Sequence, residues 1–230
     1  MKSLFYSYDV NVDTAYIIRI QGNEISERKA NEAAKSCTSI GMPHQFWDAY
    51  NGLEDPIKPP AHHSQVMRMI KVTDHYLTRG EVACALSHIS LWAKCVEDDK
   101  PLVILEHDAI MLQPYRKHGV LNSICYLGGQ EQVKFGWQVL PTPPHASDGP
   151  NKHFICRAHA YAIDPLVAKN MLAHVIKFGI NDPLDILLRT DIFPIHQMGV
   201  FACDENDGNT TILNRPENGR TTKRNSELRW

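Results

Sequence analysis

The stretch LTRGEVACALSHISLW at residues 77–92, followed by PLVILEHDA at residues 101–109, decides the fold of this chain. The first part predicts a helix that is apolar nearly all round and is therefore buried on two sides. The second part predicts a uniformly apolar strand, which is typical of the centre of a parallel sheet. Glu106 and Asp108 follow this strand, and on an extended backbone residues two apart point to the same face. Two carboxylates placed in this way could hold a hard divalent cation, which could in turn hold a phosphate.

The composition is that of an ordinary globular protein. The 230 residues are 43% hydrophobic and 22% charged, which excludes extensive disorder and suffices for a buried core. The formal net charge of −2 gives no general attraction to nucleic acid, so we expect no such partner. No signal peptide is visible, and no apolar run approaches the roughly 18 residues that a membrane span needs. We therefore expect a cytoplasmic protein, for which peripheral contact with a membrane stays open.

The cysteines favour neither zinc nor disulfides. Six of them stand at positions 37, 84, 95, 125, 156 and 203, with no CxxC pair. Such spacing lacks the pairs that are typical of zinc sites and disulfide scaffolds. Cys84 and Cys95 fall within the predicted helix, where a small buried thiol is the simplest interpretation.

Strands and helices alternate along the whole chain. We expect strands at 14–20, 45–49, 102–105, 133–140, 153–163 and around Phe193 and Val200, and helices at 23–40, 80–97, from about 114, 165–178 and 182–189. This alternation predicts an α/β domain with a mainly parallel sheet, whose ligands bind beyond the carboxyl ends of the strands. The Pro-rich loop 141–150 has the composition of a lid. We assign residues 1–213 to one domain and the polar residues 214–230 to a flexible tail.

The acidic pair also has a purely structural interpretation. Acidic residues often begin the loop after a strand without binding anything. The triplet Glu106-His107-Asp108 by itself favours the two interpretations equally, and the surrounding sequence changes this balance.

The surrounding sequence resembles glycosyltransferase family 25, the lipooligosaccharide and collagen galactosyltransferase group. That family shows a Leu-Thr-x-Gly-Glu-x-Gly-Cys-x-Leu-Ser-His stretch and then an apolar strand ending in Glu-Asp-Asp-Ala, to which the two opening segments are similar. Further similar segments are YIIRIQGNEISERKA (16–30), FWDAYNG (46–52), RAHAYAIDPLVAKNML (157–172) and NDPLDILL (181–188). The resemblance covers most of residues 14–213. It implies a GT-A-type domain with a mainly parallel mixed sheet flanked by helices.

The resemblance implies transfer of galactose, or else glucose, from a UDP-sugar to a hydroxyl of a glycan, lipid-linked or protein-linked acceptor, as in lipopolysaccharide biosynthesis. Mn²⁺ or Mg²⁺ held by Glu106 and Asp108 would stabilise the leaving diphosphate. The nucleotide would lie near Ile18, Arg19, Ile20 and Gln21, and the donor site would include Ser87, His88, Glu106 and His107. A buried, hydrogen-bonded His88 is the structural alternative.

The general base of an inverting transfer would be Asp185, which matches the family's Pro-x-Asp-x-x-Leu segment. The structural alternative is that Asp182 or Asp185 caps a helix. Asp182 suits the cap better, because Pro183 fits the first helical position. His196 is a late histidine of the kind that many metal-dependent transferases of the wider fold use as a ligand, but no motif supports it here.

Three positions depart from the family pattern. His107 replaces the middle Asp, Ala83 replaces a Gly, and Arg19 stands where the family usually has Asn. Because His107 removes one carboxylate, a catalytically degenerate relative that only binds nucleotide sugar or glycan is the main alternative function. A metal-dependent phosphohydrolase is a third interpretation, which would need more clustered acids than the sequence provides.

Overall fold

The computed structural model describes residues 14–54, 56–61, 64–73, 77–115, 123–128, 138–139, 158–197 and 200–204. The predicted lid at 141–150, the end of the domain near residue 213 and the tail at 214–230 lie outside these residues. So do most of the predicted helix from 114, most of the predicted strand at 133–140 and the first part of the predicted strand at 153–163.

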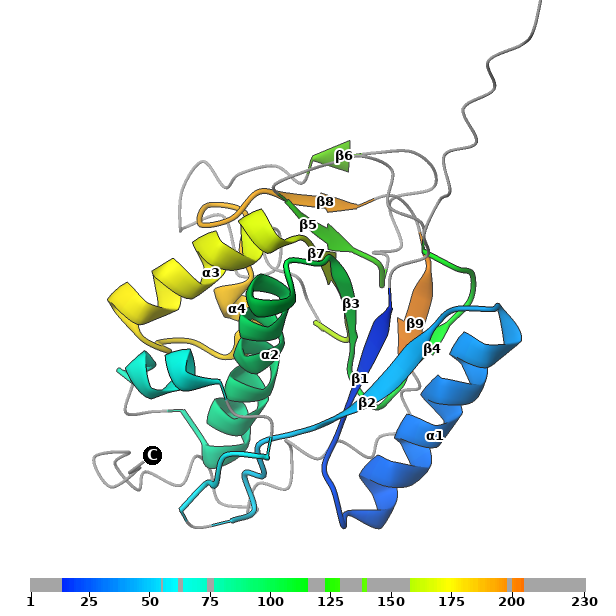
Figure 1. The fold of residues 1–230 in the computed structure, drawn as a ribbon, viewed down its shortest axis with the longest axis horizontal. Helices are drawn as coiled ribbons and strands as arrows, with labels where there is room; N and C mark the ends of the chain where they lie inside the picture. Colours follow the sequence, from blue (N-terminus) through cyan, green and yellow to red (C-terminus); the bar gives the residue numbers. More distant parts are fainter. Residues whose placement is uncertain are drawn as a thin grey trace, which may run out of the picture.

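A seven-stranded sheet runs through the middle of the molecule in the order β2-β1-β3-β7-β5-β8-β6 (Figure 1). Its strands are β1 (Ala15–Arg19), β2 (His44–Asp48), β3 (Leu102–Leu105), β5 (Ile124–Tyr126), β6 (Gln138–Val139), β7 (Ala160–Ile163) and β8 (Ile195–Gln197). Only β6 and β7 run against the other strands, because β7 is antiparallel to both β3 and β5 and β6 is antiparallel to β8. The predicted α/β class with a mixed sheet flanked by helices is confirmed.

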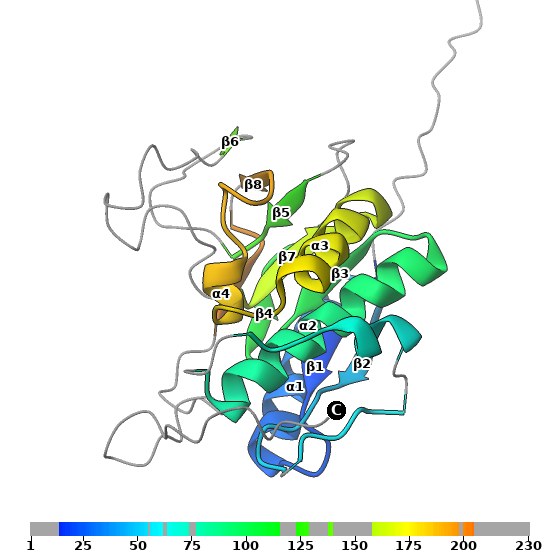
Figure 2. The same ribbon diagram turned by 90° about the vertical axis from the view of Figure 1, so that its left-hand side faces the viewer.

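Helices cover both faces of this sheet. The helices are α1 (Glu24–Ser39), α2 (Arg79–Asp98), α3 (Pro165–Phe178), the single turn α4 (Leu184–Leu187) and the 3₁₀ segment η1 (Gln65–Met69). Figure 2 shows α2, α3 and α4 on one face, and in Figure 1 α1 lies on the other, beside the small sheet of β4 (Ala109–Met111) and β9 (Ala202–Asp204).

The alternation of side chains along the central strands divides the core into two clusters. Tyr16 and Ile18 of β1 join the cluster beneath α2 and α3, while Ala15 and Ile17 join the cluster beneath α1. Side chains of a strand point alternately to the two faces, so strands buried on both faces are apolar throughout. This is why the uniformly apolar β3 could be placed at the centre from its sequence.

The start of α2 is fixed by a capping box. The Glu81 amide donates to the Thr78 hydroxyl at 3.2 Å, and the Thr78 amide donates to the Glu81 carboxylate at 2.7 Å. Two donors that the helix leaves without partners are satisfied in this way. Glu81 therefore has a structural role at the start of α2.

Two elements differ from the prediction. The helix expected at 182–189 is only α4, and Pro183 rather than Asp182 stands at its N-cap position. The prediction also missed β4, β5 and η1, which have three to five residues each. Segments this short carry too few residues for a periodic pattern.

None of the helices in the described part of the chain combines the length and the apolar character that a membrane crossing requires. The cytoplasmic location stays a prediction.

Gly128 is needed where the chain leaves β5. A Cβ at this buried position would lie 2.3 Å from Cε1 of His159 and 2.7 Å from the hydroxyl of Tyr126. We expect Gly128→Ala to lower the free energy of unfolding by about 1–3 kcal/mol through overpacking, measured by urea unfolding. Adding His159→Ala should recover part of the loss, since the ring that meets the new methyl group is then gone. A Gly128→Ala variant as stable as the parent would contradict this packing.

Candidate functional site

The ends of β1 and β3 leave the sheet at the same edge. The two strands are parallel, with Ile17 opposite Leu105, so the residues after each strand are neighbours. Ile18 is buried in the core beneath α2, and Gln21 is exposed. Arg19 forms an ion pair with Asp48, with 3.1 Å between Nε and Oδ1. The Ile20 amide donates to Ser26 Oγ at 2.8 Å. The segment 18–21 thus lies beside the acidic triplet, although the side chain of Ile18 faces the core.

The acidic triplet lies in a turn, which corrects the extended geometry that we expected. β3 ends at Leu105, and the Ala109 amide donates to the carbonyl of Glu106 at 3.0 Å. The argument that Glu106 and Asp108 share one face of a strand is therefore wrong. The two carboxylates nevertheless interact, because burial and the charge of Glu106 together raise the pKa of Asp108.

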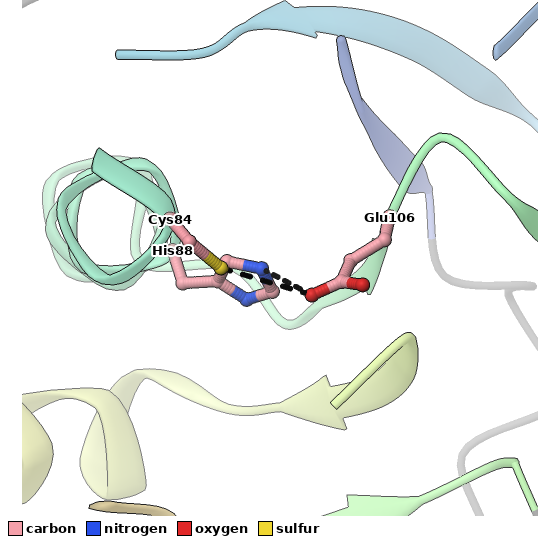
Figure 3. A group of neighbouring side chains, drawn as sticks. All are labelled: Cys84, His88 and Glu106. Carbon is pink, nitrogen blue, oxygen red and sulfur yellow. Dashed lines mark hydrogen bonds and ion pairs between the residues drawn. The ribbon is translucent and has the colours of Figure 1, made fainter. Parts of the chain in front are cut away.

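Helix α2 presents two side chains to Glu106 (Figure 3). Nε2 of His88 lies 3.3 Å from Oε1 of Glu106, and Sγ of Cys84 lies 3.9 Å from the same oxygen. Cys84 and His88 are four residues apart, so both project from one side of the helix. The ligand atoms of the three residues lie within 4.8 Å of one another and form a group that could hold a metal ion. Our sequence interpretation of Cys84 as a buried thiol missed this arrangement, which the i, i+4 spacing could have revealed.

Tyr161 joins the group from β7. Its hydroxyl lies 2.9 Å from Nδ1 of His88 and accepts a hydrogen bond from Nε1 of Trp92 at 2.9 Å. His88 and Trp92 come from the same helix, so Tyr161 connects α2 to the sheet. Both Tyr161 and Trp92 are fully buried, and the side chain of His88 is 1% exposed.

Histidines determine the charge of Glu106. Burial by itself would raise the pKa of this carboxyl, but the hydrogen bond with His88 and the charges of His88, His107 and His159 outweigh burial and lower it. Glu106 is therefore ionised at neutral pH, as a metal ligand must be. The backbone of Glu106 is fixed as well, because its amide donates to the carbonyl of His159 at 2.8 Å.

Asp108 has a buried oxygen that fits a cation. Oδ1 of Asp108 finds no hydrogen-bond partner among the described residues. A buried acceptor without a partner is costly, and burial and Glu106 already disfavour the ionised form. A divalent cation would remove both penalties, and carboxylate oxygens are the ligands that Mn²⁺ and Mg²⁺ prefer. The residues present therefore fit a hard cation held by Glu106 and Asp108.

Asp185 lies in the single turn α4. Burial raises its pKa, and the charges of Glu106 and Glu81 raise it further, while the Ile186 amide donates to Oδ1 at 3.1 Å. Asp185 also acts on the thiol of Cys84, whose pKa burial and the charges of Glu106, Asp185 and Asp108 raise. The structure thus brings Asp185 into the electrostatic environment of Glu106, from a segment about 80 residues away in the sequence.

Two of the predicted or considered residues lie elsewhere. The buried hydroxyl of Ser87 donates to the carbonyl of Ala83 at 2.7 Å and accepts from the amide of Tyr50 at 2.9 Å, which is a structural use. His196 lies in β8, which β7 and β5 separate from β3. Neither residue touches Glu106, whereas His107 is half-buried in the turn itself.

Comparison with known proteins connects this site with one family. Residues 13–125 match glycosyltransferase family 25 (LPS biosynthesis protein). A protein of Anopheles gambiae called glycosyltransferase 25 family member is 33% identical over 67 residues, which are 28% of this chain and 11% of the mosquito protein. A protein of the same description from Aedes aegypti is 34% identical over 67 residues, again 28% of this chain and 11% of the relative. The matched segment thus spans about a ninth of each curated relative. Residues 13–125, with Cys84, His88, Glu106 and Asp108 among them, belong to glycosyltransferase family 25, as the sequence predicted.

Proposed function

We propose that this protein is a metal-dependent glycosyltransferase that moves a hexose from a UDP-sugar to a hydroxyl group of a glycan, lipid-linked or protein-linked acceptor. Galactose is the first candidate sugar and glucose the second. The observation that carries the proposal is the pair of neighbouring carboxylates, Glu106 and Asp108, after β3. One of them has a buried oxygen, Oδ1 of Asp108, that has no partner among the described residues. The pair lies within the segment that matches a glycosyltransferase family.

The metal site would be formed by Glu106 and Asp108, and Mn²⁺ or Mg²⁺ bound there would stabilise the negative charge that develops on the departing UDP. The segment 18–21 lies at the same edge of the sheet as these two acids. It would contact the nucleotide there. His88 and Cys84 both contact Oε1 of Glu106. These contacts would orient the carboxylate before the donor binds.

Asp185 would serve as the base. In an inverting transfer, the acceptor oxygen attacks the anomeric carbon, the bond from that carbon to the UDP oxygen breaks, and the acceptor's proton passes to a carboxylate. A base is most effective when its pKa is not far below the working pH. Burial and neighbouring acids raise the pKa of Asp185 from its ordinary value, which improves it as a proton acceptor.

The test of this proposal is UDP release from a panel of UDP-sugars in the presence of Mn²⁺, with donor binding measured on the same samples. We expect slow, metal-dependent hydrolysis of one donor even without an acceptor, and loss of that hydrolysis on removal of the metal with a chelator. If the protein bound none of the donors and released UDP from none of them, the proposal would be overturned.

His107 supports a second candidate function, a transferase-like protein that binds nucleotide sugar or glycan without turnover. It occupies the position of the family's middle Asp, and its charge lowers the pKa values of Glu106 and Asp108, which burial and like charge act to raise. Binding of a donor without release of UDP would favour this candidate.

His107→Asp separates the two functions. If the protein is an enzyme as it stands, we expect the substitution to leave UDP release unchanged or lower, because a third carboxylate opposes the ionisation of Asp108. His107→Asn is the matched control, since it removes the imidazole without adding a charge. A large gain of UDP release with Asp but not with Asn would mark the natural site as degenerate.

A further inference from the structure

Among the described residues, side chains contact one oxygen of Glu106 and leave the other open. Oε1 faces both His88 Nε2 at 3.3 Å and Cys84 Sγ at 3.9 Å. No hydrogen bond of Oε2 is found among the residues that the structure describes, and the side chain is 26% exposed. The geometry therefore divides the carboxylate into a fixed oxygen and an open one.

The hydrogen atoms around Tyr161 determine which nitrogen of His88 is protonated. The indole Nε1 of Trp92 can only donate, so the Tyr161 oxygen accepts from it at 2.9 Å. The hydroxyl hydrogen of Tyr161 is buried and needs an acceptor. Among the described residues, the remaining partner of that hydroxyl is Nδ1 of His88, at 2.9 Å. Neutral His88 must then accept at Nδ1 and carry its hydrogen on Nε2, where it faces Glu106.

We propose that Trp92, Tyr161 and His88 form a positioning relay, in which each hydrogen bond orients the next and the last one fixes Oε1 of Glu106 so that Oε2 points to the cation site. The direction of donation is Trp92 to Tyr161, Tyr161 to His88, and His88 to Glu106. His88 is thus a positioning residue that acts through Glu106. The functional part of this proposal rests on the proposed function, since it assigns Oε2 to the divalent cation.

The alternative for this group is a metal ion bound directly by Cys84, His88 and Glu106. Coordination would need the lone pair of Nε2, so the hydrogen of His88 would have to move to Nδ1. The Tyr161 oxygen would then receive two donors, and its own buried hydrogen would lose its acceptor. Such a loss is unfavourable, and this is why the relay is the better interpretation of the contacts.

The first test is the ¹⁵N chemical shifts of His88 in the metal-free protein, at a pH where the ring is neutral. We expect the pattern of a protonated Nε2 and an unprotonated Nδ1. In Tyr161→Phe, which removes the only hydroxyl in the relay, we expect a mixture of the two tautomers. A protonated Nδ1 in the parent protein would overturn the relay, and this result does not depend on any activity.

The second test measures Mn²⁺ alone, by the electron paramagnetic resonance of the free ion. In His88→Gln the amide nitrogen stands near the position of Nε2 and can still donate to Glu106, whereas in His88→Asn it stands near Nδ1 and cannot. Removal of a partner that orients a metal ligand commonly weakens metal binding about 10–100-fold. We expect that loss in the Asn variant and substantial rescue in the Gln variant, with both variants checked for folding by circular dichroism.

The outcomes of the second test are distinguishable. Equal weakening in both variants would overturn the relay while leaving the metal site of the proposed function in place. If the parent protein binds no Mn²⁺ at all, the proposed function itself fails, whatever tautomer the spectra show.

Discussion

Asp108→Asn is expected to reduce UDP release by at least about 100-fold and, in the metal-free protein, to raise thermal stability. The first effect follows because a metal ligand stabilises developing charge by several kcal/mol, and about 1.4 kcal/mol corresponds to a factor of 10 in rate. The second follows because burial and the charge of Glu106 make ionised Asp108 unfavourable in the folded protein.

The sign of the stability effect can be checked against pH. The folded-state pKa of Asp108 is raised above the ordinary value of 3.8, so the folded protein holds this proton more tightly than the unfolded chain does. Stability from this group is fully present below the unfolded pKa and is lost as the pH rises through the folded pKa. Asp108→Asn should remove that loss, which differential scanning calorimetry between pH 4 and pH 7 would show.

Asp98→Asn is the matched control for this substitution. Asp98 lies at the far end of α2, is 42% exposed and pairs with Lys94 at 2.8 Å. Its replacement should change UDP release little, and stability by less than about 1 kcal/mol. Retention of full UDP release by Asp108→Asn would show that the carboxylate is not a metal ligand, and a fall in stability would show that it has a partner in the folded protein.

Asp185→Asn is expected to lower kcat by about 10²–10⁴-fold while donor affinity stays close to that of the parent. The asparagine keeps the shape and can still accept from the Ile186 amide, but it cannot take up a proton. Donor affinity is measured by calorimetry and turnover by UDP release, so binding and chemistry are separated. Asp191→Asn, which removes a half-exposed carboxylate paired with Arg189 at 3.0 Å, is the control.

The pH dependence of turnover in the parent protein gives a second test of Asp185 as the base. Asp185 must be ionised to accept a proton, so turnover should fall as the pH drops through its pKa. Because that pKa is raised by burial and by the charges of Glu106 and Glu81, the fall should begin above the range of an ordinary aspartate. If another residue were the base, Asp185→Asn would have the same kcat as the parent protein. Its turnover would also fall over the same pH range as that of the parent.

Much of the fold could be predicted because its patterns are local. The apolar β3, the capping box of α2 and the Asp164-Pro165 start of α3 each lie within a few residues of the chain. Their burial and hydrogen bonds therefore follow from the sequence itself. The direction of β7 could not be predicted in this way, since nothing in four residues determines the neighbour with which a strand pairs.

The candidate site was predicted only in part. Glu106 and Asp108 are recognisable in the sequence as acids after a buried strand. The turn that brings them together was not predicted. Our prediction assumed that side chains alternate between two faces, which holds only while the backbone stays extended. Tyr161 contacts His88 through a strand that lies 73 residues further along the chain. Contacts of this range depend on the tertiary fold, and a single sequence does not show them.

The antiparallel strand β7 has a consequence for the order in which the protein assembles. Its hydrogen bonds to β3 and β5 join the two halves of the sheet, and it appears late in the chain, after β1, β2, β3 and β5 have been made. During synthesis, the acids after β3 and the helix α2 can meet first, but Tyr161 and Asp185 reach them only after β7 has paired with its neighbours. Pairing of β7 with β3 and β5 should therefore be a late, long-range folding step. The nascent chain would hold both carboxylates together well before the rest of the site exists.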